Sequence, residues 1–363
     1  MLLLTNDDVR KVLSMKVCLE AIENGHKDLR AGDAANRPRI DVYSLRDREN
    51  ECYRWSSMEG VSRRNGVFAF RLKSDVAQWT PEGTDEWYCI RPGTYCGLVF
   101  LFSLETAEPL AVMHDALLTH MWVGANAALG VKYLSRADSA VVGIAGSGNM
   151  ARTYLEAFSL VRGIKEARIY SPTREHRESC AGEMSGRLGI PVRAVETLEE
   201  MARGADIVAA STDSDIPVIR NPSLLEPGMH LTDVTNKEYA PEVISRCDLV
   251  YRVGIRTIET ESLPPGFQML TGGFASCVAG TPKELAKIPI RKGIDFTRYP
   301  TYLDFLSGKE PGRTRPEQIT YVRNGGFQGL PYASVGGCVY SLCKEKGLGR
   351  EIPTEWFLEN LRD

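Results

Sequence analysis

Three features of the 363-residue sequence predict an α/β fold that contains a Rossmann-type dinucleotide-binding domain. Strand-like and helix-like segments alternate from Ala140 to about Arg252, which is typical of a parallel sheet covered by helices. Within this region an apolar strand leads directly into Gly146-x-Gly148-x-x-Ala151, and a helical pattern follows. The length corresponds to about two domains, so the Rossmann-type unit accounts for only part of the chain.

The composition is that of an ordinary globular protein, with 43% hydrophobic and 25% charged residues. A net charge of −3 gives no basic surface for nucleic acid or an anionic membrane. No apolar run reaches the roughly 18 residues of a spanning helix, and the N-terminal leucines are too few for a signal peptide. The nine cysteines lack zinc-ligand spacing. We therefore expect a soluble, reduced, cytoplasmic protein without a metal.

The first third of the chain mixes helices and strands. Thr5–Asp8 has the pattern of a helix cap, and apolar residues recur at helical spacing over Met15–Ile22. Val67–Lys73 is predicted to be a strand with bulky apolar side chains on one face and one alanine and two cations on the other. Thr94–Phe102 is a second strand candidate, and a helix rich in small residues is expected over about Leu117–Leu134.

The Rossmann-type region is predicted to contain six strands. They are Ala140–Ala145, Ala167–Tyr170, Pro191–Ala194, Ile207–Ala210, His230–Val234 and Leu249–Tyr251. After about Arg313 the sequence is again glycine-rich and helical.

The segment 141–151 carries the strongest functional signal. Gly146 allows a tight turn, Gly148 lets the backbone approach a pyrophosphate, and the small Ala151 lets the next helix pack on the strand. The helix N-terminus offers free N–H groups for the phosphates. The dinucleotide-binding residues predicted here are Gly146, Ser147, Gly148, Asn149, Met150 and Ala151.

The end of the next strand predicts which dinucleotide binds. An NAD site usually has an acidic residue there, to bind the ribose 2′-hydroxyl. This strand ends instead in Ser171, Thr173 and Arg174, which can hold a 2′-phosphate, so NADP is favoured over NAD. Alternatively, Arg174 is only a solvated residue of the first helical turn.

Later strands also end in residues that are expected to line the dinucleotide crevice. Ser211 and Thr212 close one strand, and Val234 and Thr235 end the next and are expected to reach toward the nicotinamide.

Several stretches resemble the ornithine cyclodeaminase/mu-crystallin family. They are Glu105–Ala111, Leu118–Ala125, Lys132–Leu134, the Gly146 loop and Lys346–Gly349. The resemblance implies a Rossmann domain, 126–312, inserted in an α+β substrate-binding and dimerisation domain, 1–125 plus 313–363. It also implies a homodimer, and hydride transfer between a nicotinamide and an amine/imine pair.

The resemblance also implies residues of a substrate site. Lys73 matches a family lysine near the reacting carbon, where it would bind the substrate carboxylate or transfer a proton. Arg39 matches a carboxylate-binding position, although Arg37 is an equal physical candidate. Asn324 and Gly325 lie where the C-terminal segment returns to the nicotinamide. The remaining candidates are Arg71, Met58 and Trp122 for substrate and Thr119 for the cofactor.

Two departures from the family pattern bear on the substrate. Trp122 stands where the family has a carboxylate-binding arginine, so the carboxylate is either held elsewhere, by Arg39, Arg71 or Arg91, or is absent from that place. The loop 235–241 lacks the aspartate motif of cyclodeaminases, since Asp233 and Glu238 do not align with it. Ornithine cyclisation is therefore not favoured.

Other features are open to two interpretations. The insertion Trp79–Tyr95 is aromatic and would be either a lid or a dimer-contact loop. His114 and His120 flank the family segment and are expected to be structural rather than catalytic.

We expect an NADP-dependent oxidoreductase that interconverts an amine and an imine, with Lys73 as the catalytic or anchoring group. A cyclodeaminase that releases ammonia is one alternative. A non-catalytic NADPH-dependent binding protein for a small ligand is the other.

Overall fold

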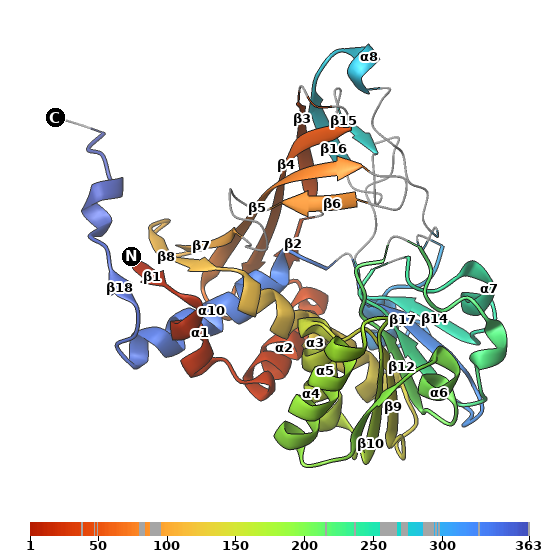
Figure 1. The fold of residues 1–363 in the computed structure, drawn as a ribbon. Helices are drawn as coiled ribbons and strands as arrows, with labels where there is room; N and C mark the ends of the chain where they lie inside the picture. The colour runs from red at the N-terminus through yellow and green to blue at the C-terminus, as the bar shows by residue number, and fades with distance from the viewer. Residues whose placement is uncertain are drawn as a thin grey trace.

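Two β-sheets with their helices form the molecule (Figure 1). The structure is a computed structural model, and it describes all residues except 38, 47, 49, 80–83, 88–95, 215, 236, 255–266, 270–274, 286–293, 295, 297, 326 and 362–363. In the described part of the chain no helix is long and apolar enough to cross a membrane.

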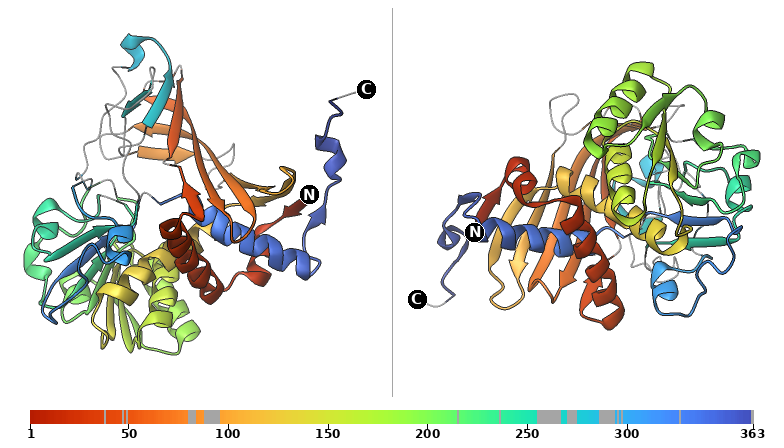
Figure 2. Two further views of the ribbon diagram at one scale, coloured as in Figure 1. Left: turned by 180° about the vertical axis from the view of Figure 1, so that it is seen from behind. Right: turned by 90° about the horizontal axis from the view of Figure 1, so that it is seen from below.

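The larger sheet has 11 strands, with the path β15–β16–β3–β4–β5–β7–β8–β1–β18, β2 on β4 and β6 on β5. The strands are β1 (Leu2–Leu4), β2 (Ala34–Asn36), β3 (Ile40–Leu45), β4 (Glu51–Ser62), β5 (Val67–Trp79), β6 (Thr84–Trp87), β7 (Gly97–Ser103), β8 (Pro109–His114), β15 (Phe267–Met269), β16 (Ala275–Ala279) and β18 (Arg350–Glu351). One face is covered by α1 (Asn6–Val12), α2 (Met15–Ala31) and α10 (Leu330–Glu345) (Figure 2).

The smaller sheet has 7 strands in the order β11–β10–β9–β12–β13–β17–β14, and all its neighbours are parallel. Its first five strands have the order 3-2-1-4-5 of a Rossmann fold, which confirms the predicted fold class. The strands are β9 (Val141–Ala145), β10 (Glu166–Tyr170), β11 (Val192–Val195), β12 (Ile207–Ala210), β13 (His230–Thr232), β14 (Leu249–Arg252) and β17 (Thr320–Arg323). The other helices are α3 (Ala116–Leu134), α4 (Asn149–Val161), α5 (Arg174–Leu188), α6 (Leu198–Ala202), α7 (Pro241–Ile244), α8 (Pro282–Leu285) and α9 (Tyr302–Leu306).

The sequence suggested that 126–312 forms one contiguous inserted domain. In the structure, each of the two predicted domains also contributes strands to the sheet of the other. The range 126–312 contains β15 and β16, which belong to the larger sheet. Conversely β17 comes from the range 313–363, but it lies between β13 and β14 of the smaller sheet. Pairing with distant strands decides where such short strands lie, and the local sequence does not reveal it.

Helix α3 joins the two halves because its small residues let both sides approach. A Cβ atom at Gly124 would lie 2.9 Å from the Thr153 carbonyl oxygen of α4, and one at Gly130 would lie 3.3 Å from Val322 of β17. The helix is buried on nearly every side from Met121 to Val131. The helix predicted over this range is therefore present, and it packs closely on both sides.

A buried histidine ties α2, α3 and the C-terminal segment together. His26 is 1% exposed, its ring stacks on Phe327 at 4.4 Å, and its Nε2 lies 2.8 Å from Asn126 Oδ1. Burial lowers the pKa of His26 to about 4. The histidine is therefore neutral in the folded protein over most of the acidic range.

We predict that acidification destabilises the fold through His26. An unfolded histidine takes up a proton below about pH 6.5, whereas His26 stays neutral down to about pH 4. The free energy of unfolding should therefore fall as the pH falls from 6.5 toward 4, by about 3 kcal/mol from this residue. Urea unfolding at several pH values measures the slope, and His26→Gln should flatten it. An equal slope in the variant would contradict this assignment.

Candidate active site

A cavity of about 800 Å³ lies at the carboxyl ends of β9, β10 and β12. Gly146 forms the turn after β9 with φ +121°, and a Cβ atom there would lie 2.4 Å from the Ser211 carbonyl oxygen. Gly148 is the N-cap residue of α4, and nothing lies within 4 Å of the position of its Cβ atom. The turn therefore has both the tight bend and the open approach that a pyrophosphate requires.

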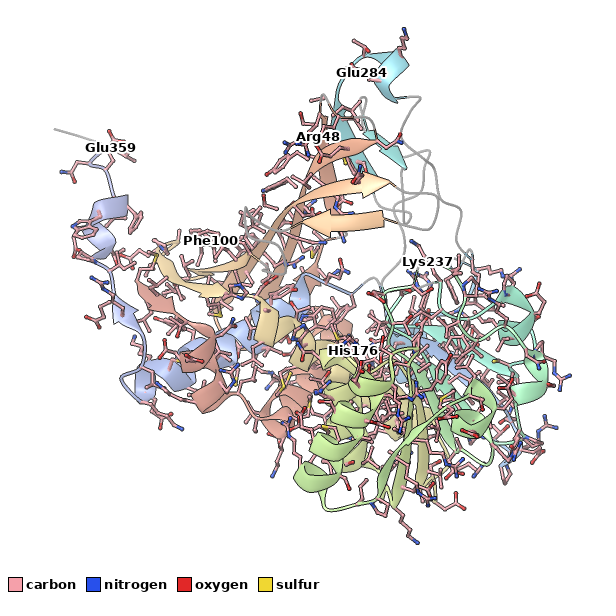
Figure 3. All side chains as sticks on the ribbon, in the orientation of Figure 1. Arg48, Phe100, His176, Lys237, Glu284 and Glu359 are labelled. Carbon is pink, nitrogen blue, oxygen red and sulfur yellow. The ribbon has the colours of Figure 1, made fainter. Side chains whose placement is uncertain are left out.

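Most of the predicted dinucleotide residues line this cavity. They are Gly146, Ser147, Gly148, Asn149, Met150, Ser171, Thr173, Ser211 and Thr212. Ala151 is fully buried, which fits its expected packing role. The lining residues that sequence reasoning missed include Arg152, His176, Ser179 and Asp213, and Figure 3 labels His176.

Arg174 does not lie where the sequence predicted it. Its Nε donates to Glu178 Oε1 at 2.7 Å one turn along α5, and its side chain is mostly exposed. The i,i+4 pairing on the helix surface explains this direction. Arg177 instead bonds the backbone, donating from Nη1 to the Ser171 carbonyl at 3.0 Å.

A buried carboxylate fixes the loops after β12 and β13. Glu238 accepts from the backbone N–H groups of Thr212, Val234 and Thr235, the last two at 2.8 Å. Burial raises the pKa of Glu238 above its usual value. Thr235 thus contributes its N–H to this loop, whereas Val234 lines a second cavity.

This second cavity, of about 360 Å³, lies beside the first and collects the predicted substrate residues. Arg39, Met58, Arg71, Lys73, Trp122, Asn324 and Gly325 all line it, with Thr119, Met150 and Val234. Sequence reasoning missed four further lining residues, Ala116, Val123, Gln328 and Tyr332. The two cavities share His120 and Met150, so they meet at the N-terminal part of α3.

The alternation of β5 explains why the cations enter this cavity. Ala69 and Arg71 are buried, while Phe68 and Phe70 on the opposite face are partly exposed. The face that carries the cations is therefore the inner face of the sheet. Met58 of β4 pairs in register with Arg71 and comes within 3.3 Å of its Nη1.

Each of the three cations has a buried carboxylate beside it. Arg39 Nε donates to Asp41 Oδ1 at 2.6 Å, Arg71 Nε donates to Asp115 Oδ2 at 2.6 Å, and Lys73 Nζ lies 3.4 Å from Asp75 Oδ2. Burial raises the pKa of Asp41, but the charge and hydrogen bond of Arg39 lower it further, so the net pKa lies below its usual value. Such pairing keeps the cations in fixed positions.

Aromatic rings also line this cavity, and the Arg71 guanidinium lies 5.7 Å from the centroid of the Tyr332 ring. Trp122 and Tyr332 meet edge to face with centroids 6.0 Å apart, and the Tyr332 hydroxyl lies 2.8 Å from Thr119 Oγ1. Trp122 is 4% exposed. An apolar ring therefore lines this cavity, as the sequence indicated.

Asn324 is held by a buried polar network. Its Nδ2 donates to the Val123 carbonyl and to the Tyr154 hydroxyl, both at 2.8 Å, and its backbone N–H donates to Asp233 Oδ1 at 3.2 Å. Burial, followed by the charge of Glu238, raises the pKa of Asp233 to about 8. The Asn324 Oδ1 and Gln328 Oε1 acceptors have no hydrogen-bond partner among the described residues. Two lining side chains thus have unused acceptors.

Most of the predicted insertion Trp79–Tyr95, with Arg91, lies outside the described residues. Strand β6, which belongs to the insertion, pairs with Val76–Trp79 of β5. His114 bonds Asn6 and the backbone of Ala116 and lines neither cavity. In contrast, His120 lines both.

Comparison with known proteins places these cavities in context. The model of the ornithine cyclodeaminase/mu-crystallin family matches residues 1–253. A putative dehydrogenase of Rhizobium meliloti is 32% identical over 230 residues, which cover 62% of this chain and 63% of that protein's own length. A Delta(1)-pyrroline-2-carboxylate reductase of Bacillus cereus is 24% identical over 71% of this chain and 74% of that protein.

A solved structure has the same overall fold. The Delta(1)-pyrroline-2-carboxylate reductase of Thermococcus litoralis, in complex with NADH and L-proline, superposes with a TM-score of 0.73. The match covers 97% of this chain and 100% of that chain, at 23% identity.

We predict that two alanine substitutions in the glycine turn act differently. Gly146→Ala should destabilise the protein, because the new methyl group would meet the Ser211 carbonyl and because φ is positive. Gly148→Ala should leave the melting temperature within a few degrees of the original but weaken dinucleotide binding at least tenfold, since the methyl group enters the space of the pyrophosphate. Thermal unfolding measures the stability of the two variants, and fluorescence titration measures their dinucleotide affinity. Equal loss of stability in the two variants would contradict this account.

Proposed function

Because this chain belongs to the ornithine cyclodeaminase/mu-crystallin family, we propose that it is an NADP-dependent oxidoreductase that interconverts an amine and an imine. The observation that carries the proposal is the pair of adjoining cavities. One has the glycine turn of a dinucleotide site, and the other contains three cations and two unused acceptors. When bound, the dinucleotide would supply or accept a hydride.

The dinucleotide would be held by the glycine turn and by the ends of three strands. The open space at Gly148 and the N-terminus of α4 suit a pyrophosphate. At the end of β10 the lining residues Ser171, Thr173, His176 and Ser179 include no carboxylate. These side chains favour a 2′-phosphate, although the Thermococcus litoralis enzyme was solved with NADH.

The substrate would be oriented by charge. Arg39, Arg71 and Lys73 would bind a carboxylate from the side of the sheet, with Lys73 as the leading anchor. Asn324 Oδ1 and Gln328 Oε1 would accept N–H groups of an amine or iminium. Trp122 would pack on the apolar part of the substrate and exclude water. The substrate class proposed is a small cyclic or linear imine that bears a carboxylate.

A second copy of the chain is the partner we propose, besides the small-molecule substrate. The outer face of the larger sheet carries partly exposed rings, among them Phe100, which Figure 3 labels. The ring centroids of Trp55 and Phe70 lie 6.1 Å apart, those of Phe70 and Phe100 6.1 Å apart, and those of Phe68 and Phe102 6.2 Å apart. Helix α10 lies on the opposite face (Figure 2). A contiguous apolar face of this kind favours self-association. Sedimentation as a monomer would contradict the dimer.

We predict that the protein binds NADPH at least about tenfold more tightly than NADH. Thr173→Asp retains an N-cap residue for α5 but places a carboxylate beside the 2′-phosphate, so it should lower NADPH affinity and spare NADH. Arg174→Ala is the matched control, since Arg174 pairs with Glu178, and it should change neither affinity. Fluorescence titration measures the affinities of the original protein and of both variants for NADPH and for NADH. Tighter binding of NADH by the original protein would overturn the NADP assignment.

We predict that the protein reduces Delta(1)-pyrroline-2-carboxylate, and the loss of NADPH absorbance measures this reaction. Lys73→Met retains the length of the side chain but removes the charge, so kcat/KM should fall about 100-fold. For a pyrroline without the carboxylate, the same substitution should lower kcat/KM by a smaller factor. Lys132→Met is the control, because Lys132 pairs with Glu23 outside the cavity.

The same assays distinguish the alternatives. Ammonia release from ornithine without net cofactor reduction would indicate a cyclodeaminase. Ligand binding without turnover of any amine or imine would indicate a binding protein and would sink the proposal.

A further inference from the structure

His120 occupies the junction of the two cavities. It lies in the first turns of α3, lines both the dinucleotide cavity and the substrate cavity, and is partly exposed. Its imidazole forms no hydrogen bond with any residue that the structure describes. A partner-free imidazole between two ligand cavities is unusual for a structural histidine, in contrast to His26 and His230, which are buried and hydrogen-bonded.

Other titratable groups near the substrate cavity already have a charged or hydrogen-bonding partner. Lys73 lies against Asp75, and Asp115 accepts from Arg71. The Tyr332 hydroxyl is bonded to Thr119, and burial raises its pKa. Arginine does not give up its proton in proteins.

Asp233 and Glu238, two buried carboxylates that follow β13 of the smaller sheet, do not line the substrate cavity. Asp233 accepts from Tyr321 and Asn324, and Glu238 accepts from three backbone N–H groups. Among the described residues, His120 is thus the lining group suited to receive and return a proton.

We infer that His120 is the catalytic acid–base of the amine/imine reaction, an inference that rests on the function proposed above. In the oxidative direction the substrate enters as an ammonium ion. His120 takes one N–H proton, and the freed lone pair forms the C=N bond as the carbon loses a hydride to the oxidised dinucleotide. The products are an iminium, the reduced dinucleotide and the proton on His120, so atoms and charge balance. In the reductive direction His120 returns the proton to the nitrogen.

The electrostatic surroundings suit this role. Burial lowers the pKa of His120 below 6.5, and Asp115 at the start of α3 opposes this shift. The charged groups that line the cavities are Arg39, Arg71 and Lys73 from the larger sheet and Arg152 and Asp213 from the Rossmann half, with His176 as the other titratable side chain. A neutral imidazole near pH 7 is a competent proton acceptor.

We predict that His120→Gln loses at least about 100-fold in kcat for L-proline oxidation. In the original protein, kcat/KM for oxidation should fall as the pH drops below the pKa of His120, and the variant should lack this acidic limb. Added imidazole should restore part of the activity of His120→Ala, which a merely structural role would not allow. His114→Gln is the matched control and should retain the profile, because His114 lines neither cavity.

A binding measurement tests the inference without turnover. With NADPH bound, L-proline cannot react, and its affinity followed by fluorescence should fall at acidic pH as His120 becomes charged and repels the ammonium. In His120→Gln the affinity should be independent of pH. A retained acidic limb together with no rescue by imidazole would overturn the role of His120 while leaving the proposed function intact. Absence of turnover with every amine and imine would instead remove the proposed function, and this inference with it.

Discussion

The close packing of α3 is the constraint on which the site depends. Gly124 brings the helix against α4, which begins at the glycine turn, and Gly130 brings it against β17. Larger side chains at these positions would push the Rossmann half away from the larger sheet. Because both contacts are tight, Thr119, Trp122 and Val123 are held in the wall of the smaller cavity and His120 where it meets the larger one. The site thus follows from backbone proximity along one helix.

Buried polar groups complete this arrangement at an energetic cost. Asp233 and Glu238 are almost fully buried, and burial raises the pKa of both carboxyl groups, which alone would destabilise the fold. Their hydrogen bonds offset the cost by fixing Asn324 and the loops after β12 and β13. On the other side, Asn36 Oδ1 accepts the N–H groups of Gly329 and Leu330 and so fixes the start of α10 near Gln328. Asn324 and Gln328 are thereby both held at one cavity.

Local signals in the sequence predicted the parts of the protein that depend on local structure. The glycine turn, the alternation of β5 and the small residues of α3 each have a short-range pattern, and the structure has each of them as predicted. Arg174 instead pairs with Glu178, because an i,i+4 partner on its own helix competes for the side chain. The strand β17 and the position of His120 between the cavities could not be predicted, since both depend on contacts between distant segments.

The indole ring of Trp122 has a consequence for how a substrate would lie. Among the described residues, the cations that line this cavity come from the side of the sheet, at Arg39, Arg71 and Lys73. The α3 side instead presents an indole ring and the imidazole of His120. An amino-acid-like substrate bound by its carboxylate would therefore direct its nitrogen away from the sheet cations, whose charge repels an ammonium. The side of the cavity left for that nitrogen is the one that borders the dinucleotide cavity, where His120 lies. An indole ring at position 122 thus separates the anion-binding part of the cavity from the part where the C–N bond would react.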